Sequence, residues 1–313
     1  MKGLSVLVTG GAGFIGSHLV DALLARGARV RVLDDFSTGR RENLPDVDVI
    51  EGDIRDARVC RAACTGMDYV FHQAALGSVP RSLVDPASTM AVNVTGTANV
   101  FAAAREAGVR RVVYASSSSV YGDAGAVVKR EGEEGRPLSP YAASKVMGEE
   151  MAEVFSRCFG QELIGLRYFN VYGPRQSPDG PYAAVVPRFF RSCLEGEAPV
   201  IHGDGEQSRD FTYVGDAVLA NLLAAGAPPE ACGRAFNVAR GERTTVNELA
   251  ARVRELAGSG APPRHEPPRP GDVLHSQADP SLAQDRLGFR AGVDLRAGLE
   301  RTLAHYLEVS WKA

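Results

Sequence analysis

The sequence predicts an α/β fold class, with a doubly wound parallel sheet followed by a smaller C-terminal region. Two observations predict it. In the first 120 residues, short apolar runs alternate with longer stretches of helical spacing, which is the pattern of parallel strands joined by crossover helices. After about residue 170, glycine and proline become frequent and the alternation loosens.

The first strand is expected at Leu4–Val8, an apolar run suited to burial on both faces of a sheet. Helical spacing follows from Phe14 to Arg26, and Gly27 is suited to the end of that helix. The later strands repeat this rhythm. They are expected at residues 29–33, 47–51, 69–71 and 112–115.

Two domains are expected. Residues 1–170 should form the first domain, to which residues 213–240 return, and residues 171–313 should form the second. The stretch Gly258–Gly271 is the richest in proline and should be irregular. Because open α/β sheets bind ligands beyond the carboxyl ends of their strands, the second domain should complete a binding site there.

The composition excludes several classes of protein. The chain has 313 residues and a formal net charge of −3, which removes the basic surface expected of a nucleic-acid binder. Five cysteines without C-x-x-C spacing favour reduced thiols, and the six histidines lack the spacing of metal ligands. No apolar stretch approaches the roughly 20 residues of a membrane span. We therefore expect a soluble cytoplasmic protein with no metal site.

A glycine-rich turn at residues 9–16, TGGAGFIG, follows the first strand and opens the first helix. Its glycines allow a tight turn, and the helix N-terminus can then meet a pyrophosphate. Asp34 ends the second strand, where a carboxylate can accept hydrogen bonds from an adenosine ribose and repel a 2′-phosphate. The pattern favours NAD as the cofactor, while Arg40 and Arg41 leave NADP open.

A candidate catalytic pair follows Ser139, which is suited to cap a helix with Pro140 in its first turn. Tyr141 and Lys145 are four residues apart, so they lie on one face of that helix. A neighbouring ammonium and a cationic nicotinamide would lower the pKa of the phenol, as general acid–base catalysis on a hydroxyl requires. Ser117, in a run of serines after a central strand, can bond the same oxygen.

Taken together, these residues resemble the extended short-chain dehydrogenase/reductase family, specifically its NAD-dependent nucleotide-sugar epimerases, which have a Rossmann fold. The resemblance covers nearly the whole chain and includes motifs at residues 72–75, 167–173, 203–205 and 209–211. It implies NAD as cofactor and a UDP-sugar as substrate. The cofactor positions that it implies are Gly10, Gly13, Phe14, Ile15, Asp34, Asp35, Ser37, Thr38, Gly39, Asp53, Ile54, Gln73, Ala74, Ala75, Asn93, Tyr141, Lys145 and Tyr168.

The resemblance also implies roles at the substrate. Ser117 and Tyr141 would flank the reacting hydroxyl, and Lys145 would hold the nicotinamide ribose. The implied substrate positions are Gly77, Ser78, Ser118, Asn170, Gln176, Ala184, Val185, Arg209, Arg269, Asp272 and Ser276. Within that set, residues 170 and 209 match positions that contact the diphosphate, and residues 269 and 272 match those that hold the uridine.

Two serines, Ser118 and Ser119, bear on which of the family's reactions is expected. In 4,6-dehydratases an Asp-Glu pair stands here, and UDP-glucuronate decarboxylases carry Glu at the second position, so both reactions lose their expected catalyst. Ser276 stands where glucose-restricted 4-epimerases carry tyrosine, which leaves room for a 2-acetamido group. The resemblance therefore implies reversible C4 epimerisation of UDP-GlcNAc to UDP-GalNAc.

Four alternatives remain open: a UDP-glucose 4-epimerase, a UDP-glucuronate 4-epimerase, a nucleotide-sugar dehydratase, and a non-catalytic NAD-binding sensor. Such sensors usually lose the tyrosine or the lysine, and both remain here. Ser177 argues against a uronate, because uronate-specific relatives tend to place an arginine nearby. Helical stretches near residues 88–107 and 141–158 match the pair through which relatives form homodimers.

Overall fold

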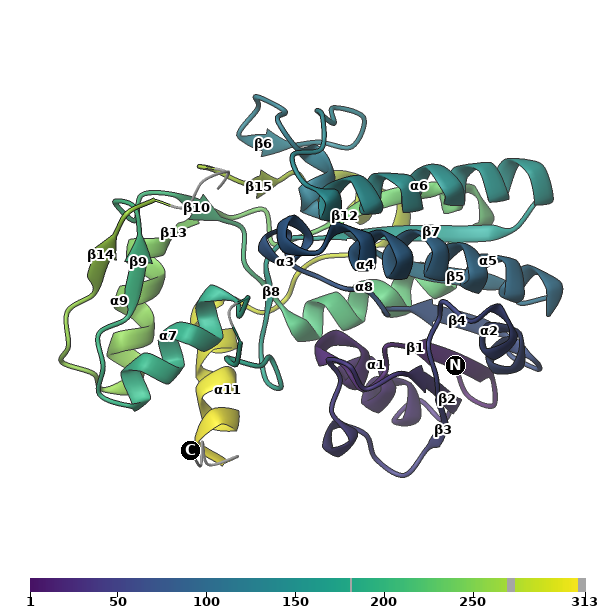
Figure 1. The fold of residues 1–313 in the computed structure, drawn as a ribbon, viewed down its shortest axis with the longest axis horizontal. Helices are drawn as coiled ribbons and strands as arrows, with labels where there is room; N and C mark the ends of the chain where they lie inside the picture. Colours follow the sequence, from purple (N-terminus) through teal and green to yellow (C-terminus); the bar gives the residue numbers. More distant parts are fainter. Residues whose placement is uncertain (181, 269–273, 309–313) are drawn as a thin grey trace.

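The computed structural model describes residues 1–180, 182–268 and 274–308, and its larger part is a parallel sheet (Figure 1). Within these residues the sheet has seven strands, in the order β12-β7-β5-β4-β1-β2-β3. Their bounds are β1 Ser5–Thr9, β2 Arg29–Asp34, β3 Asp48–Glu51, β4 Tyr69–His72, β5 Arg111–Ser117, β7 Glu162–Tyr168 and β12 Arg234–Val238. The predicted doubly wound α/β fold class is confirmed.

Helices cover both faces of this sheet. One face carries α1 (Phe14–Leu24), α8 (Val214–Gly226) and α10 (Ser281–Leu287), and the other carries α2 (Ala57–Cys64), α5 (Thr97–Glu106) and α6 (Pro140–Phe159). In β1, Val6 and Val8 pack into the first core and Leu7 into the second, and all three are 0% exposed. Burial on both faces explains why this strand is a continuous apolar run.

Strand β1 is the point at which the strand order reverses, because it pairs with β2 on one side and with β4 on the other. In an open parallel sheet a crevice forms at such a point, beyond the carboxyl ends of the strands. The glycine-rich turn follows β1 directly, so the chain carries it into this crevice.

Later parts of the chain return to the sheet. Strand β12 pairs with β7, and Phe236 lies opposite Leu166. Ala283 and Leu287 of α10 pack into the same core as α8. The sequence did not anticipate this second return, and the division into two domains at about residue 170 stays a prediction.

In the described residues, the smaller part consists of short strand pairs and three helices, and it lies beside the end of α8, which covers one face of the sheet (Figure 1). Its helices are α7 (Val185–Leu194), α9 (Val246–Ala257) and α11 (Leu295–Glu308), which share one core. The short strands are β8 Val171–Tyr172, β9 Val200–His202, β10 Ser208–Arg209, β11 Thr212–Tyr213, β13 Thr244–Thr245, β14 Arg264–Glu266 and β15 Gln277–Ala278. β15 pairs with β6 (Val128–Lys129).

The sequence predicted that the proline-rich stretch would be irregular, but part of it forms a strand. It contains β14, which pairs with β9 and places His265 opposite Ile201. This pairing joins segments more than sixty residues apart, so no local pattern reveals it. In the described part of the chain, no helix combines the length and the apolar character needed to span a membrane.

Candidate active site

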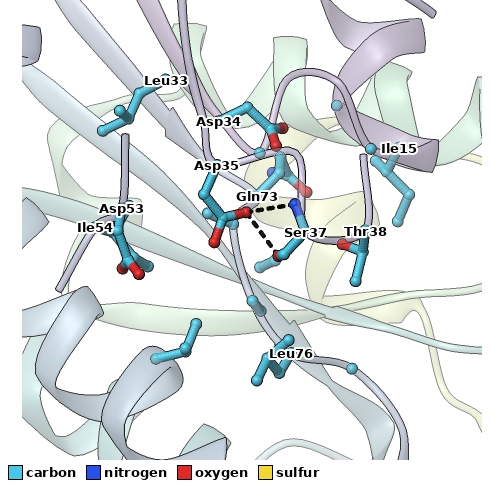
Figure 2. Close-up of a pocket in the computed structure, with 18 of the residues that line it drawn as sticks. Ile15, Leu33, Asp34, Asp35, Ser37, Thr38, Asp53, Ile54, Gln73 and Leu76 are labelled. Carbon is cyan, nitrogen blue, oxygen red and sulfur yellow. Dashed lines mark hydrogen bonds between the residues drawn. The ribbon is translucent and has the colours of Figure 1, made fainter. Parts of the chain in front are cut away.

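A cavity of about 470 Å³ opens at the carboxyl ends of the strands, beside β1 (Figure 2). Its wall comes from the glycine-rich turn, the ends of β2 and β4, the loop at residues 52–55 and the start of α6. All the cofactor positions implied by the resemblance line it except Gly39 and Asn93. The structure therefore brings together residues spread from Gly10 to Tyr168.

The glycines of the turn serve different purposes. Gly10 has a φ of +68°, and a Cβ there would lie 2.6 Å from the backbone nitrogen of Ala74. A Cβ on Gly16 would lie 2.1 Å from the carbonyl oxygen of Gly10. Both are required by the packing of the chain itself. At Gly13 a Cβ would meet only that same oxygen, at 3.2 Å, so this glycine mainly keeps the start of α1 open to the cavity.

Asp34 is bonded more to the protein than the sequence suggested. Its two carboxylate oxygens accept hydrogen bonds from the amides of Ala12 and Phe36, both at 2.9 Å, and burial raises its pKa. The carboxylate thus joins the glycine-rich turn to the end of β2. Asp35 is exposed beside it and accepts hydrogen bonds from the amide and hydroxyl of Ser37 (Figure 2).

The two arginines that left NADP open are engaged elsewhere. Arg40 forms an ion pair with Asp179 at 2.9 Å. Arg41 lies over the ring of Phe36, 5.6 Å from its centre. A 2′-phosphate would have to compete with these contacts and with the carboxylates at residues 34 and 35, so the geometry supports the preference for NAD.

Gly39 and Asn93, the two implied cofactor positions that do not line the cavity, fix the segments that form its wall. A Cβ on Gly39 would lie 2.9 Å from that of Ala12, so this glycine allows the loop after β2 to pack on the turn. Asn93 is buried, accepts a hydrogen bond from the amide of Leu76 at 2.8 Å and donates one to the hydroxyl of Ser144 at 3.0 Å. It fixes the loop after β4 against α6.

Several lining residues were missed by the sequence analysis. Most of them neighbour predicted positions in the chain: Leu33, Gly52, Arg55, Leu76, Ala115 and Ser116. Ser88 and Val92 do not, since they come from α4 (Pro86–Met90) and from a π-helix at Ala91–Gly96. π-Helical turns often occur at functional sites, but nothing in the sequence distinguishes one from an α-helix.

The candidate catalytic pair lies at the start of α6. The Ser139 hydroxyl accepts a hydrogen bond from the amide of Ala142 at 3.1 Å, so the predicted cap is present. Tyr141 and Lys145 both line the cavity. The ammonium of Lys145 is buried, lies 5.9 Å from the centre of the Tyr141 ring and donates a hydrogen bond to the carbonyl of Ala115 at 2.9 Å.

The expected lowering of the phenol pKa is not produced by the protein's own groups. Burial raises the pKa of Tyr141, and a hydrogen bond with Ser117 offsets only part of that rise. Burial also lowers the pKa of Lys145 to about 8, while the carboxylate of Glu149 acts in the opposite direction. Among the protein's own groups desolvation is therefore the larger effect, and the expected lowering, which includes the charge of the nicotinamide, stays a prediction.

Two of the implied substrate positions have unusual backbone geometry. Ser78 has a φ of +98° and Asn170 a φ of +32°, values that L-residues rarely adopt. Ser78 caps α3 (Val79–Val84), and the Asn170 side chain donates to the carbonyl of Asp210 at 3.2 Å. Strained residues of this kind concentrate at binding sites, where the surrounding structure holds them in place.

The other substrate positions are spread over several elements. Gly77 lines the cavity, and Ser118 begins the short 3₁₀-helix that follows β5. The side-chain oxygen of Gln176 is buried and has no hydrogen-bond partner among the described residues. Ala184 and Val185 begin α7, Arg209 lies in β10, and the amide of Ser276 donates to the carbonyl of Ser208. Arg269 and Asp272 lie outside the described residues.

Comparison with known proteins identifies the family. Residues 6–239 match the model of the NAD dependent epimerase/dehydratase family. The chain belongs to this family. The resemblance inferred from the sequence is confirmed at that level, and with it the cofactor class.

Individual members are similar over nearly their whole length. The chain is 40% identical over 316 residues to a UDP-glucose 4-epimerase of Mycolicibacterium smegmatis, covering 97% of this chain and 98% of the relative. A UDP-N-acetylglucosamine 4-epimerase from Methanobrevibacter ruminantium, solved with UDP-N-acetylmuramic acid, superposes with a TM-score of 0.94 at 39% identity, covering 99% and 100% of the two chains. A UDP-glucose 4-epimerase of Thermus thermophilus, solved with NAD, gives 0.89 at 39% identity, covering 97% and 99%.

Proposed function

We propose that the protein is an NAD-dependent UDP-sugar 4-epimerase that interconverts UDP-GlcNAc and UDP-GalNAc. One observation carries the proposal: Tyr141 and Lys145 lie on one helix face in the wall of the cavity that most of the implied cofactor positions line. The acids that elimination or decarboxylation would need are replaced by Ser118 and Ser119. The named functions of the relatives described above support the reaction class.

The residues of the cavity fit NAD. The open N-terminus of α1 offers amides and a positive dipole end to the pyrophosphate. Asp34 and Asp35 retain lone pairs for an adenosine ribose, and Ile54 offers an apolar surface to the adenine. Held by these residues, NAD would supply a reversible hydride acceptor for carbon 4 of the sugar.

The protein's own side chains have two tasks in the reaction: to transfer one proton, and to supply a positive charge beside the phenol. The phenolate of Tyr141 takes the proton of the 4-hydroxyl and later gives it back. Ser117, which bonds Tyr141, is placed to hold the same hydroxyl. The ammonium of Lys145 is placed to bind the nicotinamide ribose, and its charge together with that of the oxidised nicotinamide offsets the effect of burial on the phenol pKa.

The preference for an acetylated sugar depends on space in the substrate pocket. Ser276 is small and half-buried, and its backbone is fixed to β10 next to Arg209. This small side chain supports a 2-acetamido substituent, and one of the relatives is named a UDP-N-acetylglucosamine 4-epimerase. A UDP-glucose 4-epimerase is the second candidate, because other relatives carry that name.

One incubation tests both the reaction and the preference. The purified protein is mixed separately with UDP-GlcNAc, UDP-glucose and UDP-glucuronate without added NAD, and the epimers are separated by chromatography. We expect conversion of UDP-GlcNAc at the highest kcat/KM. Faster turnover of UDP-glucose or UDP-glucuronate would contradict the preference, and no conversion of any sugar would contradict the proposed reaction.

We further propose a homodimer formed through α5 and α6. Met147 and Val154 of α6 lie seven residues apart on one helix face and are 47% and 49% exposed, as is typical of a helix face that meets a partner. Light scattering of the purified protein should give twice the monomer mass. The cytoplasmic location stays a prediction, and the five free cysteines of the described residues are compatible with it.

A further inference from the structure

Glu149 lies one helical turn beyond Lys145 on α6, and the proposed mechanism gives it no role. Residues 141, 145 and 149 follow one another at four-residue spacing, so their side chains lie along one face of the helix. That face packs against β5 and β7, two neighbouring interior strands of the sheet. Glu149 is thus carried on the same rigid face as the candidate catalytic pair.

The carboxylate of Glu149 is held by both strands. Ser116 of β5 donates a short hydrogen bond to it. Arg167 of β7 donates two, at 2.9 Å from Nε and 2.7 Å from Nη2. Ser116 and Arg167 are paired in the sheet, so neighbouring side chains on two strands hold one carboxylate. The Arg167 side chain is 8% exposed and that of Glu149 is 14% exposed, so solvent screens these bonds little.

The same strand also holds Lys145. Ala115, which accepts the hydrogen bond from the Lys145 ammonium, precedes Ser116 in β5. Two successive turns of α6 are therefore fixed to two successive residues of one strand. Ser116 also lines the cofactor cavity. This attachment therefore fixes the position of α6 along β5, and with it the position of α6 relative to the cavity.

Of the titratable groups that face Lys145, Glu149 is the one whose charge favours the ammonium form of the lysine. His72 of β4 is buried and neutral, since burial and the nearby ammonium lower its pKa to about 3. Without the cofactor, burial also raises the pKa of Tyr141 on the same helix face and so favours its neutral phenol. Arg167 of β7 carries a positive charge, which it shares between Glu149 and Glu134. On β5, the buried phenol of Tyr114 faces Glu149 and Arg167 and is neutral.

We propose that Glu149 is a positioning residue of this active site, which fixes α6 to β5 and β7 and keeps the buried Lys145 charged. The inference rests on the proposed function of Lys145. It adds that the reaction depends on a carboxylate that contacts neither the cofactor cavity nor the sugar. A residue acting only in packing would affect stability but would not change the pH at which Lys145 loses its proton.

The test compares Glu149→Gln with Glu153→Gln. Glu153 lies one turn further along α6 in an exposed ion pair with Arg157, so it is a matched control. For the folded holoenzymes, kcat/KM is measured from pH 6 to 10. Removing the Glu149 charge lowers the Lys145 pKa, so we expect the alkaline loss of activity to begin about one pH unit lower. Glu153→Gln should keep the wild-type profile.

Two further measurements separate the possible causes. Glu149→Asp keeps the charge, so it should restore the alkaline limb to within about 0.3 units even if kcat falls. NADH binding, followed by nucleotide fluorescence across the same pH range, reports on Lys145 without any sugar conversion. It should weaken at lower pH in Glu149→Gln, and it gives a result even if no tested sugar is converted.

The outcomes are distinct. A downward shift in Glu149→Gln that Glu149→Asp reverses supports the proposal. Identical pH profiles for wild type and Glu149→Gln, in turnover and in NADH binding, would overturn it. An equal shift in Glu153→Gln would also overturn it, because the effect would then be general to charge on α6. If Glu149→Gln does not fold, two other variants decide the question. A wild-type pH profile in Ser116→Ala, together with a shifted pH profile in Glu149→Asp, would then overturn the proposal.

Discussion

The two sides of the cleft are built differently. On the cofactor side, the glycine-rich turn, the ends of β2 and β4 and the start of α6 all belong to one sheet and its helices, and they enclose a formed cavity. On the sugar side, the implied residues lie on two-residue strands, helix ends and loops. The cofactor side is positioned by long parallel strands, whereas the sugar side is positioned by single hydrogen bonds between distant segments.

This difference predicts how well each side of the cleft tolerates substitution. A cavity formed by a buried sheet tolerates little change, because its wall is also the core of the protein. A pocket formed by loops can change a side chain without disturbing that core. We therefore expect substitutions on the cofactor side to affect catalysis and stability, and those on the sugar side to affect substrate choice.

The largest effect is expected for Tyr141→Phe on the cofactor side. Removing the phenol oxygen removes the proposed general base, so kcat should fall by about 10²–10⁴-fold. The hydroxyl is not needed to hold NAD, so bound NAD, released by denaturation and quantified by absorbance, should match wild type. Unchanged turnover in a correctly folded variant would show that another group moves the proton.

The next effect compares two glycines with positive φ. In Gly10→Ala, the new Cβ would lie 2.6 Å from Ala74, whereas in Gly203→Ala the nearest atom is 3.7 Å away, on Pro268. Both variants incur about 1–2 kcal/mol of backbone strain. Gly10→Ala should lose a further 1–3 kcal/mol or so from overpacking. Urea unfolding measures both, and equal losses would show that the two sides of the cleft are equally tolerant.

A smaller, selective effect is expected for Ser276→Tyr on the sugar side. The phenol would fill the space assigned to the 2-acetamido group, so KM for UDP-GlcNAc should rise about tenfold or more. KM for UDP-glucose serves as the internal control and should change little. Equal changes for both sugars would show that Ser276 does not read the substituent at carbon 2.

The smallest effect is expected for one exposed ion pair that joins the two sides. Arg40 and Asp179 form an ion pair in which both side chains are more than half exposed, at 53% and 56%. Asp179 shares its charge between Arg40 and Arg191, and exposed pairs of this kind contribute about 0.2–1 kcal/mol, so Asp179→Asn should lower the free energy of unfolding by about 1 kcal/mol or less. Denaturant titration at low and high salt checks it, and a larger loss would mean that the two sides are coupled more strongly than their contacts indicate.

The sequence predicted the cofactor side well because its signals are local. The run before the turn, the glycines and the pair at Tyr141 and Lys145 are all recognised within a few neighbouring residues. The pairing of β14 with β9, the packing of α10 and the bonds to Glu149 join distant segments, so no local pattern contains them. The rise that burial causes in the pKa of Tyr141 is not visible in the sequence for a related reason, since burial is a property of the fold.

The same limit applies to hydrogen bonds within the site. The two amides that donate to Asp34 come within reach only when the turn is folded, so the sequence alone did not predict these bonds, and the structure shows both. The sequence could not show that Ser116 and Arg167 meet on one carboxylate, because that depends on the register of β5 against β7. Register and burial are therefore the two physical quantities that the structure added.

The central claim is that the hydride removed from carbon 4 returns to the same carbon without entering solvent. It is tested by incubating UDP-GlcNAc deuterated at carbon 4 with the protein, without added NAD, and following both epimers by mass spectrometry and NMR. The account predicts that UDP-GalNAc forms with its deuterium retained at carbon 4. Loss of deuterium to water during conversion would contradict it.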